Sequence, residues 1–503
     1  MRCLPGRSGR PASQPGNPSK NRRFARVVGV GFACAYLVLL VYNLTKPLPA
    51  GISVEGPLRP VDGMEFMADL TFQVGQERRV EQRIFDRVIS MIEAAEGFVV
   101  IDMFLFKGQY GEETGLRPLA RELTQSLVEK KTFDPDLEVW FITDEINNFY
   151  GAYTSREIAR LQEAGIEVVA TRTERLRDSN PAFSAFWRML FGWFGTAGPG
   201  WLPDIINSSG RRVTARAYVK MLNFKANHRK LIVTDKECLI TSANPHDGSS
   251  LHSNIGFVGA GPICGDLLDG ERAVAAFSGG TVQDWPAYPA KKTQPGGSRD
   301  GGEAGPGQGT VQMVTEGKIR SSLLDDLAAA GLGHQVDLAM FYLSERGVVE
   351  ALLAAEERGA SIRLILDSNK DAFGREKNGI PNRQVAGELV RKSEGRIQVR
   401  WYDTRGEQFH TKLVRVAGPG GVVIMGGSAN LTRRNIRDYN LEADLRFSLS
   451  RNAPLALAVE EYIERIFTND GGDYTLPFEA YRDESWIKGV LYRLEEFTGF
   501  CSF

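Results

Sequence analysis

The sequence predicts an α/β fold of two similar lobes, each with a mainly parallel-stranded sheet and flanking helices, and one site between the lobes. Three observations carry this prediction. The chain has 503 residues, enough for two or more domains with their own cores. Segments typical of helices and strands alternate, and the series occurs twice in the same order. Each series ends on a short apolar run in which His and Lys stand two residues apart, at His228 and Lys230 and again at His410 and Lys412.

The first series lies between residues 80 and 170. Its apolar periodicity predicts, in order, helix 80–95, strand 98–106, helix 117–130, strand 137–144, helix 155–164 and strand 166–170. Parallel strands need helical crossovers of this kind, so we expect neighbouring strands to run in the same direction.

The second series lies between residues 319 and 402 and repeats this order. It predicts helix 319–330, strand 336–343, a helix capped by Ser344 and running to Arg358, strand 362–367, helix 383–392 and strand 397–402. The repeat suggests two lobes that face one another. A Gly- and Pro-rich segment without hydrophobic periodicity joins them.

An uncharged apolar segment runs from Val27 to Leu44, and residues 1–26 before it carry seven Arg or Lys and no acid. About 20 apolar residues span a bilayer, and the basic side stays in the cytoplasm. We therefore expect an uncleaved single-pass anchor, with the rest of the chain on the extracytoplasmic side, typically of a bacterial inner membrane. A cleaved signal peptide is the alternative, although no A-x-A cleavage site follows.

These features give the expected division of the chain. It consists of a basic cytoplasmic tail (1–26), the transmembrane anchor (27–44), a connector (45–64), the first lobe (65–280), the linker (281–315), the second lobe (316–480) and a C-terminal amphipathic helix (481–503).

An insertion at 173–225 distinguishes the first lobe from the second. It is rich in large apolar residues, namely Phe183, Phe186, Trp187, Met189, Leu190, Phe191, Trp193, Phe194 and Trp201, with Arg188 among them. Such a segment either adds core under a lid or meets a lipid surface or acyl chain. The predicted C-terminal helix also has its apolar residues on one side, and we expect that side to pack on the core.

Composition excludes some classes of function. The formal net charge is −1, and no basic stripe interleaved with aromatic residues is present, so nucleic acid is not an expected partner. The five cysteines lack C-x-x-C spacing, and we interpret them as ordinary thiols and not as a zinc site or a disulfide framework.

The two His/Lys pairs carry the functional prediction. On a strand, residues two apart point to the same face, so each pair presents an imidazole and an ammonium group together. Two such pairs could surround one phosphate. A single His-x-Lys pair is more often a packed or exposed histidine beside a solvated lysine. Here the pair occurs twice, and each copy precedes a Ser-Ala-Asn.

These residues resemble the phospholipase D superfamily, whose signature H-x-K-x4-D followed by a Gly/Ser-x-Asn turn occurs twice. The first copy is His228-Arg229-Lys230, Asp235 and Thr241-Ser242-Ala243-Asn244; the second is His410-Thr411-Lys412 and Gly427-Ser428-Ala429-Asn430, with Glu442 downstream. The resemblance covers about residues 65–470. The second copy has Ala417 in place of the motif Asp, and the first is one residue short before its Ser-Ala-Asn. In the family that Asp mainly holds the motif together.

The resemblance implies a two-step phosphodiester reaction. His228 is expected to attack phosphorus and His410 to act as the acid and base, an order that the residues alone do not decide. Lys230 and Lys412 would neutralise the phosphate oxygens, Asn244 and Asn430 would bind them, Asp235 would complete the catalytic motif, and Glu442 would orient a histidine. No metal and no cofactor are expected. His246 and His252 are interpreted as loop residues, and Asp144 and Asp367 as turn formers at strand ends.

Taken together, the anchor and the aromatic insertion favour a membrane phospholipid as the substrate. The expected reaction is head-group hydrolysis, or transfer to an alcohol or phosphatidylglycerol as in cardiolipin synthases. A nuclease of the same superfamily and a catalytically inactive membrane scaffold are the alternatives. The sequence does not indicate an oligomeric state.

Overall fold

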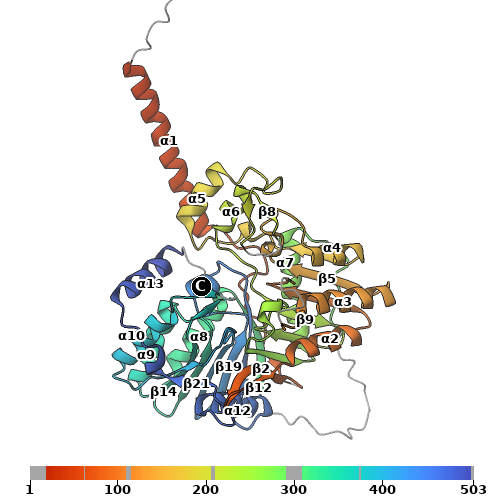
Figure 1. Ribbon diagram of the computed structural model, residues 1–503, viewed down its shortest axis with the longest axis vertical. Helices are drawn as coiled ribbons and strands as arrows, with labels where there is room; N and C mark the ends of the chain where they lie inside the picture. Colours follow the sequence, from red (N-terminus) through yellow and green to blue (C-terminus); the bar gives the residue numbers. More distant parts are fainter. Residues whose placement is uncertain are drawn as a thin grey trace, which may run out of the picture.

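The computed structural model describes residues 18–61, 63–108, 115–205, 210–289, 309–372 and 375–499. Residues 1–17 of the predicted basic tail and 290–308 of the predicted linker lie outside this part. The described residues form two mixed β-sheets flanked by helices, and the apolar helix α1 (Pro18–Thr45) leaves one end of the molecule (Figure 1). The predicted α/β architecture with two lobes is confirmed. The domain limits themselves stay a prediction.

The first sheet has eight strands in the order β3-β2-β11-β10-β9-β4-β5-β6. Their bounds are β2 Glu65–Val74, β3 Glu77–Glu81, β4 Phe98–Met103, β5 Glu138–Thr143, β6 Glu167–Ala170, β9 Lys230–Thr234, β10 Cys238–Thr241 and β11 Asn254–Gly259. Strand β5 pairs in parallel with β4 and β6, and the remaining pairs of this sheet are antiparallel. We call the residues built on this sheet the first lobe.

The second sheet has nine strands in the order β1-β12-β20-β19-β18-β13-β14-β17-β21. Their bounds are β1 Arg59–Pro60, β12 Gly309–Thr315, β13 Gln335–Met340, β14 Ser361–Asp367, β17 Gln398–Tyr402, β18 Lys412–Gly418, β19 Gly421–Gly427, β20 Ala443–Leu449 and β21 Thr475–Pro477. Strand β14 pairs in parallel with β13 and β17. We call the residues built on this sheet the second lobe.

The prediction of mainly parallel sheets is wrong in its strand direction. Helical crossovers do make the first three strands of each series parallel, as expected. After each His/Lys pair, however, a short turn joins β9 to β10 and β18 to β19, and longer connections add the antiparallel strands β11 and β20. Short turns join only antiparallel neighbours, so both sheets are mixed.

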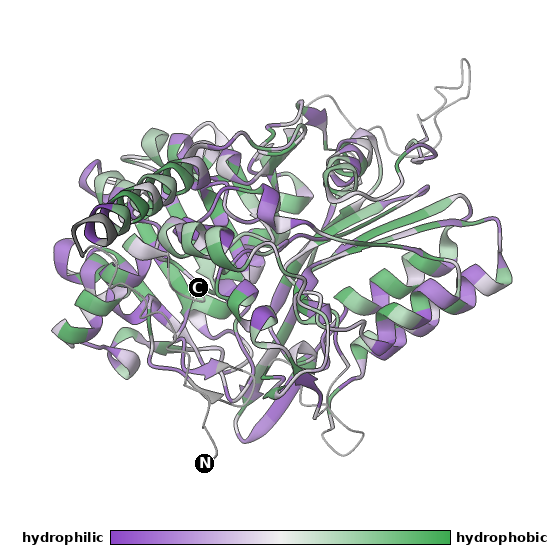
Figure 2. Ribbon diagram, turned by 90° about the horizontal axis from the view of Figure 1, so that it is seen from above, coloured by the Kyte–Doolittle hydropathy of each residue, from purple (hydrophilic) through white to green (hydrophobic). Residues whose placement is uncertain are grey.

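Helices cover the sheets, and their hydrophobic and hydrophilic residues lie on different sides (Figure 2). The main ones are α2 Ile84–Ala94, α3 Leu119–Phe133, α4 Arg156–Glu163 and α7 Pro262–Ser278 in the first lobe, and α8 Gly317–Ala329, α9 Arg346–Glu357, α10 Asn382–Lys392 and α12 Pro454–Thr468 in the second. The N-cap of α9 is not Ser344 but Glu345, whose carboxylate accepts from the N–H of Val348 at 2.8 Å.

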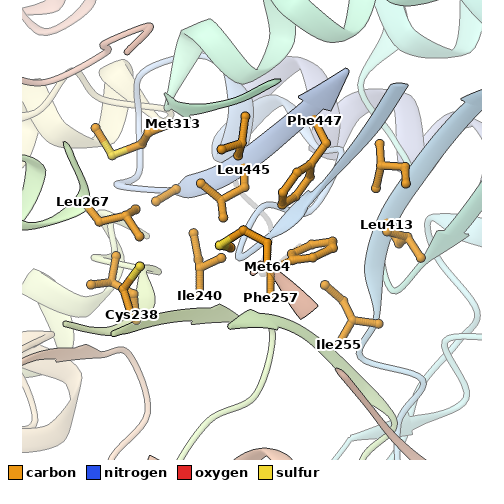
Figure 3. Close-up of a cluster of buried hydrophobic side chains, with 14 of the residues drawn as sticks. Met64, Cys238, Ile240, Ile255, Phe257, Leu267, Met313, Leu413, Leu445 and Phe447 are labelled. Atoms are coloured by element: carbon orange, nitrogen blue, oxygen red, sulfur yellow. The ribbon is translucent and has the colours of Figure 1, made fainter. Parts of the chain in front are cut away.

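The two lobes share one continuous apolar core. Strands β10 and β11 of the first sheet contribute Ile240, Ile255 and Phe257, which meet Leu445 and Phe447 of β20 (Figure 3). Phe257 and Phe447 pack with ring centroids 4.9 Å apart. Buried contact of this kind holds the two sheets in a defined relation, so a site between them has a fixed geometry.

Two cysteines are not ordinary thiols. Cys238 on β10 and Cys264 on α7 form a disulfide, with Cα atoms 5.3 Å apart and 26 residues apart in the chain. The interpretation of all cysteines as free thiols is therefore wrong for this pair. The pairing depends on how α7 packs on the sheet, which residue spacing does not reveal. Cys34 is free and exposed on α1.

The aromatic insertion lies at the foot of α1 (Figure 1). It contains α5 (Pro181–Leu190), which packs against α1, the short strands β7 (Leu202–Pro203) and β8 (Arg212–Val213), and α6 (Ala215–Met221).

The C-terminal helix α13 (Trp486–Thr498) does not bury its apolar side. Its buried residues are Tyr492 and Glu496, whereas Trp486 is 76% exposed and Phe497 82%. The expectation that the apolar side packs on the core is therefore wrong.

Candidate active site

The two His/Lys pairs meet between the lobes, each at the start of an equivalent strand. Lys230 opens β9 and Lys412 opens β18, with the histidine just before each strand. Each histidine is held by the opposite lobe through its backbone. The N–H of His228 donates to the carbonyl of Leu441 at 2.9 Å, and that of His410 to the carbonyl of Ser253 at 2.8 Å. Each lobe therefore fixes the histidine of the other lobe in position.

His228 is oriented by groups of the second lobe. Its Nδ1 lies 3.1 Å from the carbonyl oxygen of Ser428 and 2.9 Å from Oε1 of Glu442. A carbonyl oxygen can only accept, so Nδ1 carries the proton and Nε2 keeps its lone pair. Glu442 is buried and receives further hydrogen bonds from Ser428 Oγ and Asn435 Nδ2. The predicted orienting role of Glu442 thus has a geometric basis.

His410 is oriented by the first lobe in the same way, but through an amide. Its Nδ1 lies 3.1 Å from Oδ1 of Asn254. The amide nitrogen of Asn254 donates to the carbonyl of His252 at 3.1 Å, so its oxygen faces the imidazole. Nδ1 of His410 therefore donates, and again Nε2 is left for chemistry. Sequence reasoning missed Asn254, although it stands on β11 as Glu442 stands just before β20.

The two lysines repeat one arrangement. Nζ of Lys230 donates to the carbonyl of His228 and Nζ of Lys412 to that of His410, both at 2.7 Å. Each ammonium also lies 5.1 Å from the centroid of a phenylalanine ring, Phe104 for Lys230 and Phe341 for Lys412. These rings, which sequence reasoning missed, also flank the imidazoles, with centroids 4.7 Å from His228 and 4.9 Å from His410.

Both imidazoles and both motif asparagines line one cavity of about 360 Å³. Asn244 and Asn430 are almost fully buried, and Oδ1 of Asn430 has no hydrogen-bond partner within the described residues. The other lining groups include aromatic and basic residues: Phe104, Tyr150, Phe224, Lys225, Phe341, Tyr342, Lys377 and Arg434. An apolar wall with a few basic and amide groups suits an amphiphilic anion.

Two aspartates support the residue that precedes each histidine. Oδ2 of Asp144 accepts from the N–H of Asn227 at 2.6 Å, and Oδ2 of Asp367 from that of Phe409 at 2.8 Å. Both were interpreted from sequence as turn formers at strand ends. Both do accept local backbone bonds there, from Ile146 and Asn369, but they also fix the approach to the catalytic strands.

Asp235 does not lie in the site. It stands in the turn after β9, five residues or about 16 Å along the strand from Lys230. Its Oδ1 accepts from the N–H of Glu96 at 3.0 Å. Ala417 is the equivalent position on β18, five residues from Lys412 and equally far from the site. The second copy can therefore keep its site geometry without the motif Asp.

Burial governs the protonation of the site. It lowers the pKa of His228 and of His410 well below the usual range, and the neighbouring ammonium groups add to the effect. It also lowers the pKa of Lys230 to about 7 and raises that of Glu442 to about 8. A buried cluster of this kind is short of negative charge, which a phosphodiester would supply.

A known protein family matches part of the second lobe in sequence. The sequence profile described as "Cardiolipin synthase, PLD-like domain" matches residues 323–467, which include His410, Lys412, Asn430 and Glu442. Residues 323–467 are a domain of the phospholipase D superfamily. A domain of this kind implies phosphodiesterase or phosphatidyltransferase activity, and the second His/Lys pair lies within the matched residues. No curated protein sequence matches the chain.

One of the similar solved structures shows the same overall fold. The crystal structure of phosphatidylserine synthase from Haemophilus influenzae Rd KW20 aligns with a TM-score of 0.54 and 11% identity, over 93% of this chain and 99% of that one. A polyphosphate kinase from Porphyromonas gingivalis aligns with a TM-score of 0.44 and 12% identity, over 87% and 53%. The phospholipase D family member Nuc from Salmonella typhimurium gives 0.26 and 19%, over 33% and 97%. The last two scores are too low to support an argument.

Proposed function

We propose that this phospholipase D-like protein cleaves or exchanges the head-group phosphodiester of membrane phospholipids through a phosphohistidine intermediate, as a phosphatidyltransferase of cardiolipin synthase type or a hydrolase. One observation carries the proposal. Two imidazoles, each with Nδ1 held by the opposite lobe, line one cavity together with two asparagines, and a lysine stands beside each imidazole. Two equivalent histidines with their Nε2 atoms available divide a displacement at phosphorus into two steps.

In the first step, Nε2 of His228 forms a bond to phosphorus while the bond from phosphorus to the head-group oxygen breaks. The negative charge of the bound phosphodiester raises the pKa of His410, so that its Nε2 enters this step protonated. The leaving oxygen takes this proton, an alcohol departs and His410 becomes neutral. The positive charge that develops on the His228 ring lies beside Glu442, whose Oε1 is 2.9 Å from Nδ1. Burial favours the protonated form of Glu442 in the free protein, and a positive charge on the adjacent ring lowers the pKa of Glu442 and so favours its carboxylate form, which is a physical reason for assigning the nucleophile to His228.

In the second step, the roles reverse at the same atoms. Nε2 of His410 takes a proton from water or from an acceptor alcohol, whose oxygen attacks phosphorus. The bond between phosphorus and His228 breaks, and the product is phosphatidic acid or a new diester. The residues that exclude water from the cavity decide between these outcomes.

The basic groups stabilise charge on the phosphate oxygens. Lys230 and Lys412 each donate one N–H to a histidine carbonyl, which leaves two N–H donors on each ammonium group for the phosphate oxygens. Asn244 and Asn430 add amide donors, and Arg434 adds a further cation on the cavity wall.

A phospholipid substrate is supported by three features. The apolar α1 is long enough to cross a membrane. The cavity wall is partly aromatic. The matching family profile is named for cardiolipin synthase, and the structure of similar fold is a phosphatidylserine synthase. The acceptor would be an alcohol or phosphatidylglycerol.

We also infer that α1 anchors the chain with its N-terminus in the cytoplasm and the lobes on the extracytoplasmic side of a bacterial inner membrane. The disulfide between Cys238 and Cys264 supports this orientation, because disulfides persist in oxidising compartments and are rare in the cytosol.

The test is an incubation of the full-length protein with mixed phospholipid vesicles, beside the His228→Ala and His410→Ala variants. Products are resolved by mass spectrometry, with glycerol or phosphatidylglycerol offered as acceptor. We expect a new diester lipid or phosphatidic acid from the wild type and neither from the variants. Cleavage of DNA or RNA without lipid turnover would contradict the proposal and indicate a nuclease. No activity on any phosphodiester would indicate a catalytically inactive scaffold.

A further inference from the structure

Helix α13 presents an apolar side that the rest of the described chain leaves uncovered. Trp486, Leu494 and Phe497 are 76%, 55% and 82% exposed. The opposite side is attached to the second lobe, because the hydroxyl of Tyr492 donates to the carbonyl of Ser344 at 2.9 Å and Glu496 accepts from Ser344 Oγ at 2.8 Å. The helix is thus held rigidly with its hydrophobic side outward, which is the geometry of an in-plane membrane helix.

The end of α13 is linked to the foot of α1. Nη1 of Arg433 donates to the carbonyls of both Ser179 and Glu496, at 3.2 and 3.5 Å. Asp178, the residue before Ser179, forms an ion pair of 2.9 Å with Lys46, which directly follows α1. Figure 1 shows α13 and α5 at the end of the molecule from which α1 emerges.

Helix α5 lies beside the last turns of α1. The hydroxyl of Tyr36 donates to the carbonyl of Ala182 at 3.1 Å. Tyr36 precedes Leu44 by eight residues, or about 12 Å of helix. With α1 spanning the bilayer up to Leu44, the start of α5 therefore lies inside the bilayer, in its outer leaflet. The residues after it, Trp193 and Phe194, are 82% and 59% exposed.

The catalytic cavity opens beside the same features. Lys225 lines the cavity, and its Nζ lies 3.0 Å from Asp178, the partner of Lys46 at the foot of α1. Arg434, next to Arg433, lines it as well. The anchor, the aromatic segment and α13 are thus attached to the rim of one cavity.

We propose that α13, together with α5 and residues 191–201, lies in the outer leaflet of the bilayer that α1 crosses, so that the cavity receives phospholipid directly from the membrane surface. This inference rests on the proposed anchoring and lipid chemistry. The occupant is the lipid bilayer itself. Lys488 and Arg493 on α13 are matched by Glu495 and Glu496, so insertion depends on apolar burial more than on anionic lipid.

The test measures depth and not catalysis. Full-length protein with Cys3, Cys34 and Cys501 changed to Ser keeps its disulfide and carries one added cysteine, at Leu494→Cys or Trp193→Cys, labelled with an environment-sensitive fluorophore. Matched controls are Leu332→Cys and Phe133→Cys, whose apolar side chains are 85% and 87% exposed. Leu332 and Phe133 precede β13 and β5, at the sheet ends opposite the histidines. Proteins are reconstituted in phosphatidylethanolamine and phosphatidylglycerol vesicles containing spin-labelled quencher lipids.

We expect a blue shift and strong quenching at Leu494 and Trp193, and neither at the control positions. Quenching at Leu494 that matches the controls would overturn the inference. A blue shift without lipid quenching, growing with protein concentration, would assign the α13 surface to a second copy and would overturn it too. The readout is independent of turnover. Quenching in a protein that cleaves no lipid would therefore reject the proposed function, whereas the inference that α13 lies in the membrane would stand.

Discussion

At the scale of single residues, the two histidines differ in the group that holds Nδ1. Glu442 faces His228, whereas Asn254 faces His410. A carboxylate favours the charged imidazole more than an amide does. The near-symmetric site therefore has two chemically different halves, which the repeated motif does not reveal because Asn254 and Glu442 lie downstream of it.

Asn254 is expected to act by positioning His410. We predict that Asn254→Ala lowers kcat on vesicle lipid by about 10- to 100-fold with little change in KM, since the tautomer of the acid and base is no longer fixed. Asn254→Asp should restore much of the rate and move the alkaline limb of the pH profile upward, because the carboxylate raises the pKa of His410. An unchanged kcat in Asn254→Ala would contradict this role.

Glu442 gives a prediction for stability against pH. Burial raises its pKa to about 8 in the folded protein, from 4.5 for an ordinary Glu. The folded state thus keeps a proton that the unfolded state releases, so this group destabilises the fold as pH rises between these values. Glutamine cannot titrate. We predict that Glu442→Gln gains stability relative to the wild type from about pH 5 to about pH 8, by at most about 1.4 kcal/mol per unit.

Denaturant unfolding at several pH values measures this difference. Glu129→Gln, on the exposed side of α3, controls for the loss of one carboxylate. A difference between Glu442→Gln and wild type that stays flat with pH would show that Glu442 is charged in the folded state.

At the scale of elements, the helix and strand alternation was predictable, because buried parallel strands and amphipathic helices have distinct periodicities. A strand was expected at each His/Lys pair, but its antiparallel direction was not. In β9 and β18 every residue is buried, so the period-2 alternation that marks a half-exposed antiparallel strand is missing. The exposure of α13 was also missed, because periodicity identifies an apolar side but not its partner.

The turn after β9 tests whether the motif Asp is catalytic. We predict that Asp235→Ala keeps kcat close to wild type and lowers the free energy of unfolding by about 1 kcal/mol, the loss of one hydrogen bond to Glu96. His228→Ala, assayed in parallel, should abolish turnover. A loss of kcat in Asp235→Ala comparable with that in His228→Ala would restore Asp235 to the catalytic machinery.

At the scale of the whole molecule, the site exists only because the lobes are joined. The predicted residues His228, Lys230, His410, Lys412, Asn244 and Asn430 come together there, as the repeat suggested. Of their supporting residues, Glu442 was expected from the family resemblance, whereas Asn254 and the backbone contact of His228 to Leu441 were not, because these partners come from the opposite lobe. Tertiary packing, and not local sequence, chooses these partners.

The disulfide contributes at this scale by restricting the unfolded chain. We predict that the Cys238→Ala/Cys264→Ala double variant loses about 3 kcal/mol of unfolding free energy, as expected for a loop of this length. Denaturant unfolding measures it, with Cys34→Ser as the control. Equal stability of the double variant and the wild type would show that the two cysteines are not bonded in the mature protein.

The central claim is that His228 and His410 serve one phosphate as nucleophile and acid/base. The most direct measurement uses a phosphatidyl ester of p-nitrophenol, whose leaving group needs no acid, with acid-free peptide mass spectrometry after rapid quenching. In His410→Ala, which lacks the base for the second step, we predict a phosphatidyl adduct on His228. The same adduct should be absent from His228→Ala. No adduct in His410→Ala, or an adduct on another residue, would contradict the account.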